Sequence, residues 1–164
     1  MSELLLNLTS GLIGAVLGVI GAVCIERWKE RQRRMGAGRA VLAELLTNAA
    51  RALRFKTTGI LHSFSDTTWH SQLPLVAQLL PWPDLQKLVL AYDSALRLFE
   101  NSRALSQEKL FDQKYRNNFL GLAKEFRQAI EVLRHKTLSS KEKLVFESDL
   151  AKFDSEVASI EGKS

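Results

Sequence analysis

The sequence predicts an all-α protein in which one N-terminal transmembrane helix precedes a cytoplasmic bundle of four or five helices. An uncharged apolar run from Leu4 to Ile25 predicts the membrane helix, and a basic cluster directly follows that run. Turn-forming residues are scarce, because the 164 residues include only three prolines and nine glycines, and four of the glycines lie inside the apolar run. This scarcity favours long helices over a many-stranded sheet.

The apolar run is long enough to cross a bilayer. Its 22 residues would form a helix of about 33 Å, against a hydrocarbon thickness of about 30 Å. A cleaved signal peptide would have a basic start and a shorter apolar stretch, whereas Glu3 precedes this run and the bases follow it. We therefore predict an uncleaved anchor over residues 1–25.

The charges beside the run predict its orientation. The segment from Glu26 to Arg39 contains six basic and two acidic residues, which accounts for +4 of the chain's net charge of +5. Basic residues remain on the cytoplasmic side of a membrane helix. We expect a single-pass protein of the cell inner membrane, with its N-terminus outside and its C-terminal domain cytoplasmic.

Glycines are regularly spaced within the run. Gly11, Gly14, Gly18 and Gly21 fall on one helical face, and Asn7 extends that face by one turn. Small residues four positions apart let two membrane helices approach closely. We interpret this face as a site of helix association, which makes a homo-oligomer the expected state. The alternative is the ordinary enrichment of glycine in membrane helices.

Residues 26–39 form a basic juxtamembrane segment. Trp28 suits the headgroup region, and its basic neighbours can contact lipid phosphates. The predicted headgroup contacts are Arg27, Trp28, Lys29, Arg31, Arg33 and Arg34. Gly36 and Gly38 predict a kink at the end of this segment, before a helical bundle over residues 40–164.

Helical periodicity continues through the bundle. Val41, Leu45 and Ala49 begin one apolar stripe, which continues to about Phe55, and Gly59 ends that helix. Helix starts are expected near residues 65–68, at Asp84 after Pro83, at Ser106, and at a capping box formed by Ser139 and Glu142. The stripes of the last two helices run from Leu110 and Phe111 to Leu133, and from Phe146 to Ile160.

No pattern predicts catalysis or cofactor binding. His62, His70 and His135 lack the spacing of a metal site, and we expect neither metal nor cofactor. Phe111, Tyr115 and Phe119 share a helical stripe, so we interpret them as core residues and consider nucleic acid an unlikely partner. Trp69, His70 and Trp82 flank the irregular segment 60–83 and are the candidate partner surface, because irregular segments often carry function.

The order of features resembles a broad group of bacterial single-pass proteins with uncharacterised helical cytoplasmic domains. The features are the glycine-rich span, Glu26-Arg27-Trp28, a helix with Glu44 and Asn48, a Trp69 segment and a helix with Tyr92. The resemblance covers the first hundred residues and implies a bacterial inner membrane, but no activity.

Three functional hypotheses follow. The first is a non-enzymatic, membrane-anchored interaction protein that self-associates through its span and binds a protein partner through its bundle. The second is an oligomeric effector that perturbs the membrane, although a charge-free helix is a poor pore lining. The third is a helical enzyme without a recognisable motif.

Overall fold

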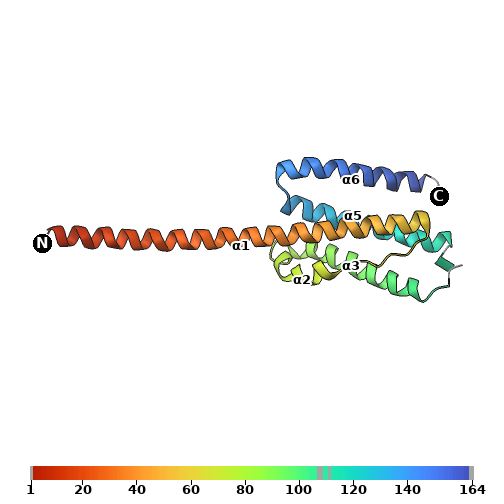
Figure 1. The fold of residues 1–164 in the computed structure, drawn as a ribbon, viewed down its shortest axis with the longest axis horizontal. Coiled ribbons are helices and arrows are strands. Elements are labelled where there is room, and N and C mark those ends of the chain that lie inside the picture. The colour runs from red at the N-terminus through yellow and green to blue at the C-terminus, as the bar shows by residue number, and fades with distance from the viewer. Residues whose placement is uncertain (1, 107–108, 111, 163–164) are drawn as a thin grey trace. The chain divides into compact units, whose positions relative to one another are not determined.

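Helices are the only regular secondary structure in the described part of the chain. A computed structural model describes residues 2–106, 109–110 and 112–162, with side chains from Gly14 onward. Its helices are α1 (Ser2–Thr58), α2 (Thr67–Val76), α3 (Trp82–Arg103), α5 (Gln113–Thr137) and α6 (Ser140–Glu161), as Figure 1 shows. No strand occurs among these residues. The predicted all-α class and helical bundle are therefore confirmed.

The chain divides into two units, residues 1–34 and 35–164. The first unit is the N-terminal part of α1. Among the described residues, no helix has a segment long and apolar enough to cross a membrane. The described part of the chain thus does not show the predicted span. The N-terminal part of that span, residues 4–13, lies outside the residues whose side chains are described.

The predicted kink at Gly36–Gly38 does not interrupt the helix, because both glycines lie within the continuous helix α1. Gly38 instead permits close packing. A Cβ atom at this position would overlap the Thr137 side chain at the end of α5 and lie 3.3 Å from Leu79 Cδ1. A Cβ atom at Gly36 would meet nothing within 4 Å. Only the second glycine is therefore required by the packing.

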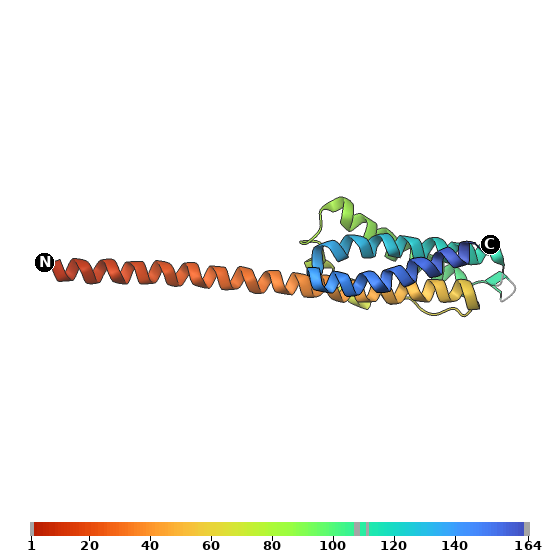
Figure 2. The same cartoon turned by 90° about the horizontal axis from the view of Figure 1, so that it is seen from above.

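The core of the second unit lies between α1, α3 and α5. Each helix presents small and large apolar side chains at intervals of three and four residues, as expected for helices that bury one face. The buried residues include Val41, Leu45, Ala49 and Phe55 of α1, Leu88, Ala91 and Ala95 of α3, and Phe119, Phe126, Ile130 and Leu133 of α5. Figure 2 shows α5 and α6 running in opposite directions beside α1.

The ends of the helices agree in part with the predictions. Gly59 ends α1 with a φ of 74°, a conformation that favours glycine. The capping box of Ser139 and Glu142 at the start of α6 is confirmed. Ser106 is the predicted start of the next helix, and Lys109 and Leu110 are indeed helical, with the Leu110 amide donating to the Ser106 carbonyl at 3.1 Å. The long helix α5, however, begins only at Gln113, where Asp112 accepts a hydrogen bond from the Lys114 amide at 2.9 Å. Leu110 consequently precedes that helix, and Phe111 lies outside the described residues.

Candidate functional site

The Glu44 carboxylate is the centre of a buried polar cluster. Glu44 lies in α1 and is 7% exposed. Its Oε1 atom accepts hydrogen bonds from Tyr92 Oη at 2.8 Å and from the Trp69 amide at 3.0 Å. Its Oε2 atom accepts from Ser65 Oγ at 2.8 Å and from the Thr68 amide at 2.9 Å. Four donors from three segments therefore converge on one carboxylate.

This carboxylate caps α2 from another helix. The residue in the N-cap position, Asp66, makes no side-chain cap hydrogen bond. The first amides of a helix need an acceptor, and a negative charge there is favourable. Glu44 accepts from two of those amides. The contact thus fixes the start of α2 against α1.

Asn48 lies one turn further along α1 and binds the segment that leads into α2. Its Nδ2 atom donates to the Ser65 carbonyl at 2.6 Å, and its Oδ1 atom accepts from the Ser65 amide at 2.9 Å. Asn48 is completely buried. Both hydrogen-bonding groups of its side chain are therefore used to hold the peptide backbone of one residue.

The surroundings of Glu44 favour its charged form. Burial by itself would raise its pKa, but the hydrogen bonds from Ser65, Thr68, Tyr92 and Trp69 outweigh burial and lower the pKa. Burial, the hydrogen bond to Glu44 and the negative charges of Glu44 and Asp66 raise the pKa of Tyr92. The pair therefore stays as carboxylate and phenol, with the phenol as donor. A carboxylate that already accepts four hydrogen bonds is suited to holding structure rather than to transferring protons.

The structure corrects the surface prediction for Trp69. This side chain is 5% exposed, and its ring stacks on Tyr92 with centroids 4.8 Å apart. Trp69 lies within the segment 60–83 that the sequence predicts to be irregular, which suggests exposure. It instead belongs to α2, where its amide donates a hydrogen bond to Glu44 and its ring packs in the core. His70 and Trp82 are exposed, and His70 Nε2 lies 3.1 Å from Asp66 Oδ2.

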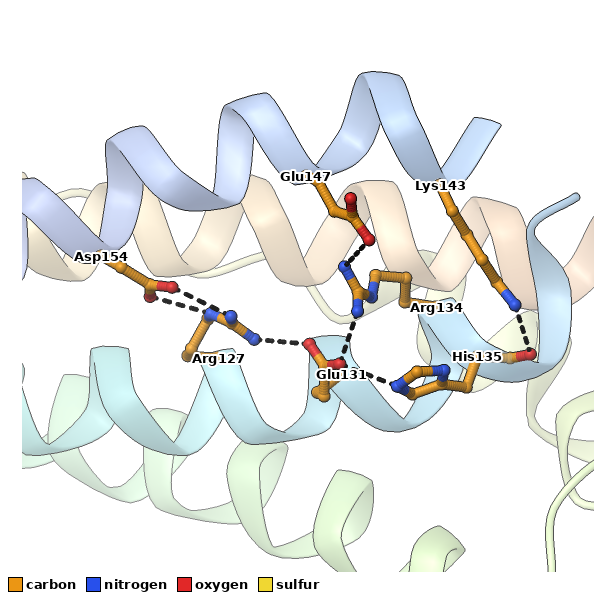
Figure 3. Close-up of polar contacts among 7 residues, drawn as sticks. All are labelled: Arg127, Glu131, Arg134, His135, Lys143, Glu147 and Asp154. Atoms are coloured by element: carbon orange, nitrogen blue, oxygen red, sulfur yellow. Dashed lines mark hydrogen bonds and ion pairs between the residues drawn. The ribbon is translucent and has the colours of Figure 1, made fainter. Parts of the chain in front are cut away.

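Charged side chains also connect α5 to α6. Figure 3 shows Arg127 between Asp154 and Glu131, and Arg134 between Glu147 and Glu131. The Arg127 guanidinium contacts both Asp154 oxygens, at 2.9 and 3.0 Å. Arg134 lies 3.3 Å from Glu147. We call the two pairs that join α5 to α6, Arg127 with Asp154 and Arg134 with Glu147, the ionic seam.

Glu131 supports the seam from within α5. It accepts hydrogen bonds from both arginines and lies 2.9 Å from His135 Nε2. Burial opposes ionisation of Glu131, but the Arg127 hydrogen bond and the charges of Arg134 and Arg127 lower its pKa. The carboxylate of Glu131 therefore stays ionised beside the two arginines.

The residues predicted for membrane contact lie in the first unit. Gly14, Gly18 and Gly21 have nothing within 4 Å of an added Cβ atom. The side chains of Asn7 and the space around Gly11 lie outside the described residues. The headgroup residues Arg27, Trp28, Lys29, Arg31 and Arg33 are exposed, and Arg34 pairs with Glu30 at 3.1 Å.

Within the described residues, no three histidine, cysteine, aspartate or glutamate side chains are grouped so as to hold a metal ion. The predicted core position of Phe119 is confirmed, because this side chain is completely buried. The chain matches no known protein family, and neither curated proteins nor solved structures gave a significant match.

No known sequence motif predicts the Glu44 cluster, although Glu44, Asn48, Trp69 and Tyr92 all belong to the features that resemble the bacterial single-pass proteins. The signal that could have found it is a glutamate and an asparagine one turn apart on the apolar stripe of Val41, Leu45 and Ala49. Polar side chains on a core stripe need buried partners. Sequence spacing does not show that those partners are the amides of a helix twenty residues away.

Proposed function

We propose that the chain is a non-enzymatic, membrane-anchored interaction protein of a bacterial inner membrane. The segment from Leu4 to Ile25 is its single span, the N-terminus lies outside, and the bundle lies in the cytoplasm. The spans associate through the glycine face, and the bundle binds a protein partner.

The exposed apolar side chains in the N-terminal part of α1 are the observation that supports a membrane anchor. Between Gly14 and Ile25 the apolar side chains are exposed around the whole helix. Val16, Val19, Ile20 and Val23 lie on one side and are 42–65% exposed, whereas Leu17 and Ile25, at 62% and 56%, lie on other sides. A helix that is apolar all round is normally buried in a core or in a membrane.

The glycine face gives this helix a smooth side. At 100° per residue, Gly14, Gly18 and Gly21 lie opposite the ridge of Val16, Val19, Ile20 and Val23. The hydrophobic effect does not drive helices together within lipid, so membrane helices associate through close van der Waals packing, which small residues allow. This arrangement supports self-association through the glycines.

The bundle supplies the interaction surface. The Glu44 carboxylate, the most deeply buried acidic group among the described residues, accepts four hydrogen bonds and holds α2 in place. The exposed apolar side chains of the bundle include Trp82 at 69% and Leu90 at 54%, both on α3. Exposed aromatic side chains are common anchors in protein interfaces. Trp82 and neighbouring residues of α3 are therefore the proposed partner surface.

Alkaline carbonate extraction of membranes tests the anchor. The wild-type chain should stay in the membrane pellet. Replacing Leu17 and Ile20 with lysine should release it, because a lysine near the bilayer centre costs about 3 kcal/mol. The matched control replaces Leu144 and Val145, which are 71% and 72% exposed on α6, with lysine. This control should stay in the pellet, and release of the wild-type chain would refute the anchor.

A further inference from the structure

The last helix of the bundle is held differently from the others. α5 has nine completely or almost completely buried side chains, whereas α6, of similar length, has only Leu150. Phe146, Phe153, Val157 and Ile160 are partly buried against the core. The helix is thus attached along one narrow apolar stripe.

Charge pairs supply much of the remaining attachment. In addition to the ionic seam, Glu142 pairs with Arg39 of α1 at 3.0 Å, and Glu161 pairs with Lys124 of α5. The acidic partners are 42–54% exposed. Exposed ion pairs contribute little stability and are weakened by salt. α6 is therefore an element with low local stability.

The two facing helices carry complementary net charge. α5 has six basic and two acidic side chains, a net charge of +4. α6 has three basic and six acidic side chains, a net charge of −3. Such complementarity selects which helix can bind. The surface beneath α6 is a site for an acidic amphipathic helix.

The site is also open along one edge. A groove of about 430 Å³ separates α1 from α6, with Leu46, Ala50 and Leu53 on the α1 side and Phe153 on the α6 side. The partly buried α6 stripe therefore has an open edge through which it can leave. A helix of the same pattern could enter by the same route.

The connection between α5 and α6 favours exchange. Only Leu138 and Ser139 separate the two helices. Domain swapping replaces the contacts of an element with the same contacts made to another copy, so only the hinge changes its conformation. Short hinge loops favour this exchange. The α6 helix of a second copy has the required length, stripe and charge.

We propose that α6 exchanges between two copies of this chain, so that each copy's α1 and α5 bind the partner's α6. This inference rests on the proposed function, because anchored spans that associate hold two bundles together at high local concentration. The ionic seam then forms between copies, and the bundle takes part in the self-association.

The test is crosslinking between two differently tagged full-length chains, both with Cys24→Ala. One copy carries Lys124→Cys and the other Glu161→Cys, which leaves the ionic seam intact. A short bismaleimide is added to membranes containing both copies. The expected result is a covalent species that carries both tags. A single chain that carries both Lys124→Cys and Glu161→Cys is the control, because its crosslinking shows that the two cysteines react with the bismaleimide.

Two comparisons make the result decisive. A partner with Ser148→Cys, an exposed position on α6, should give several-fold less of the two-tag species. A flexible insertion between Leu138 and Ser139 should also reduce that species, because a longer connection favours the closed arrangement, in which α6 packs on its own chain, over exchange. If the Ser148→Cys and Glu161→Cys partners gave equal yields of the two-tag species, the crosslinks would report only that two bundles lie near each other. This result would overturn the exchange.

The exchange is also overturned if no two-tag species forms while the double-cysteine chain links internally. Carbonate extraction of the same membranes reports separately on the anchor. Failure of the anchor would move the chain to the soluble fraction, where crosslinking can still be scored. The two proposals can therefore fail independently.

Discussion

Glu44 makes the most demanding prediction about the fold, because one substitution removes the acceptor of four donors. In Glu44→Ala the Thr68 and Trp69 amides lose their cap, which costs about 1 kcal/mol. The buried Tyr92 hydroxyl loses its partner, which costs about 2 kcal/mol. The Ser65 hydroxyl is only partly buried and can turn to water. The total is about 3 kcal/mol, a large part of the stability of a typical domain.

Urea unfolding of the detergent-solubilised chain measures this loss. Trp69 becomes the only tryptophan when the exposed Trp28 and Trp82 are replaced by phenylalanine, so its fluorescence reports on the cluster. Glu44→Ala should lower the midpoint with an unchanged slope. Glu100→Ala, at an exposed position of α3, is the control and should stay within about 0.5 kcal/mol. If Glu44→Ala matched this control, the cluster would not hold α2 in place.

The remaining predictions concern the same cluster, the packing of α1 and the span. Because the folded pKa of Glu44 is lowered, its charge stabilises the fold above its unfolded pKa, and this contribution is lost as the pH falls through the folded pKa. Unfolding midpoints of Glu44→Gln should accordingly depend less on pH in this acidic range than those of the wild-type chain, and equal slopes would contradict the assignment. Gly38→Ala should destabilise the bundle by about 1–3 kcal/mol through overpacking against Thr137. Gly36→Ala should instead stabilise the bundle by up to about 1 kcal/mol. Thermal unfolding followed by circular dichroism compares the two variants, and equal effects would refute the packing argument. A Cβ atom added at Gly14 or Gly18 meets nothing within 4 Å. Isoleucine at both positions should therefore abolish crosslinks between neighbouring spans in membranes without changing the unfolding midpoint, and unchanged crosslinks between the spans would rule out the glycine face.

Periodicity and capping residues predicted much of the fold, because these signals are local. The stripe from Val41 to Phe55 does line the core, and Ser139 with Glu142 does start α6. Both depend on residues within a few turns of each other. The apolar spacing that begins at Leu110 does not separate α5 from the helical residues Lys109 and Leu110 before it, whereas the Asp112 cap defines the start of α5.

The candidate site was less predictable because its contacts are distant in the sequence. Glu44 reaches Tyr92 across 48 positions, and no spacing rule links them. Trp69 was assigned to the surface from its irregular surroundings, although its stacking on Tyr92 buries it. At Gly38 the sequence predicts a kink and not close packing, because the approach of Thr137, almost a hundred positions away, has no local signature.

Labelling of single cysteines from one side of the membrane tests the central proposal most directly. In a Cys24→Ala background, Ser2→Cys and Ser148→Cys place one thiol before the span and one on α6. A membrane-impermeant maleimide applied to intact spheroplasts should label position 2, and should label position 148 only after detergent is added. Labelling of position 148 in intact spheroplasts, or equal protection of both positions, would contradict a single span with a cytoplasmic bundle.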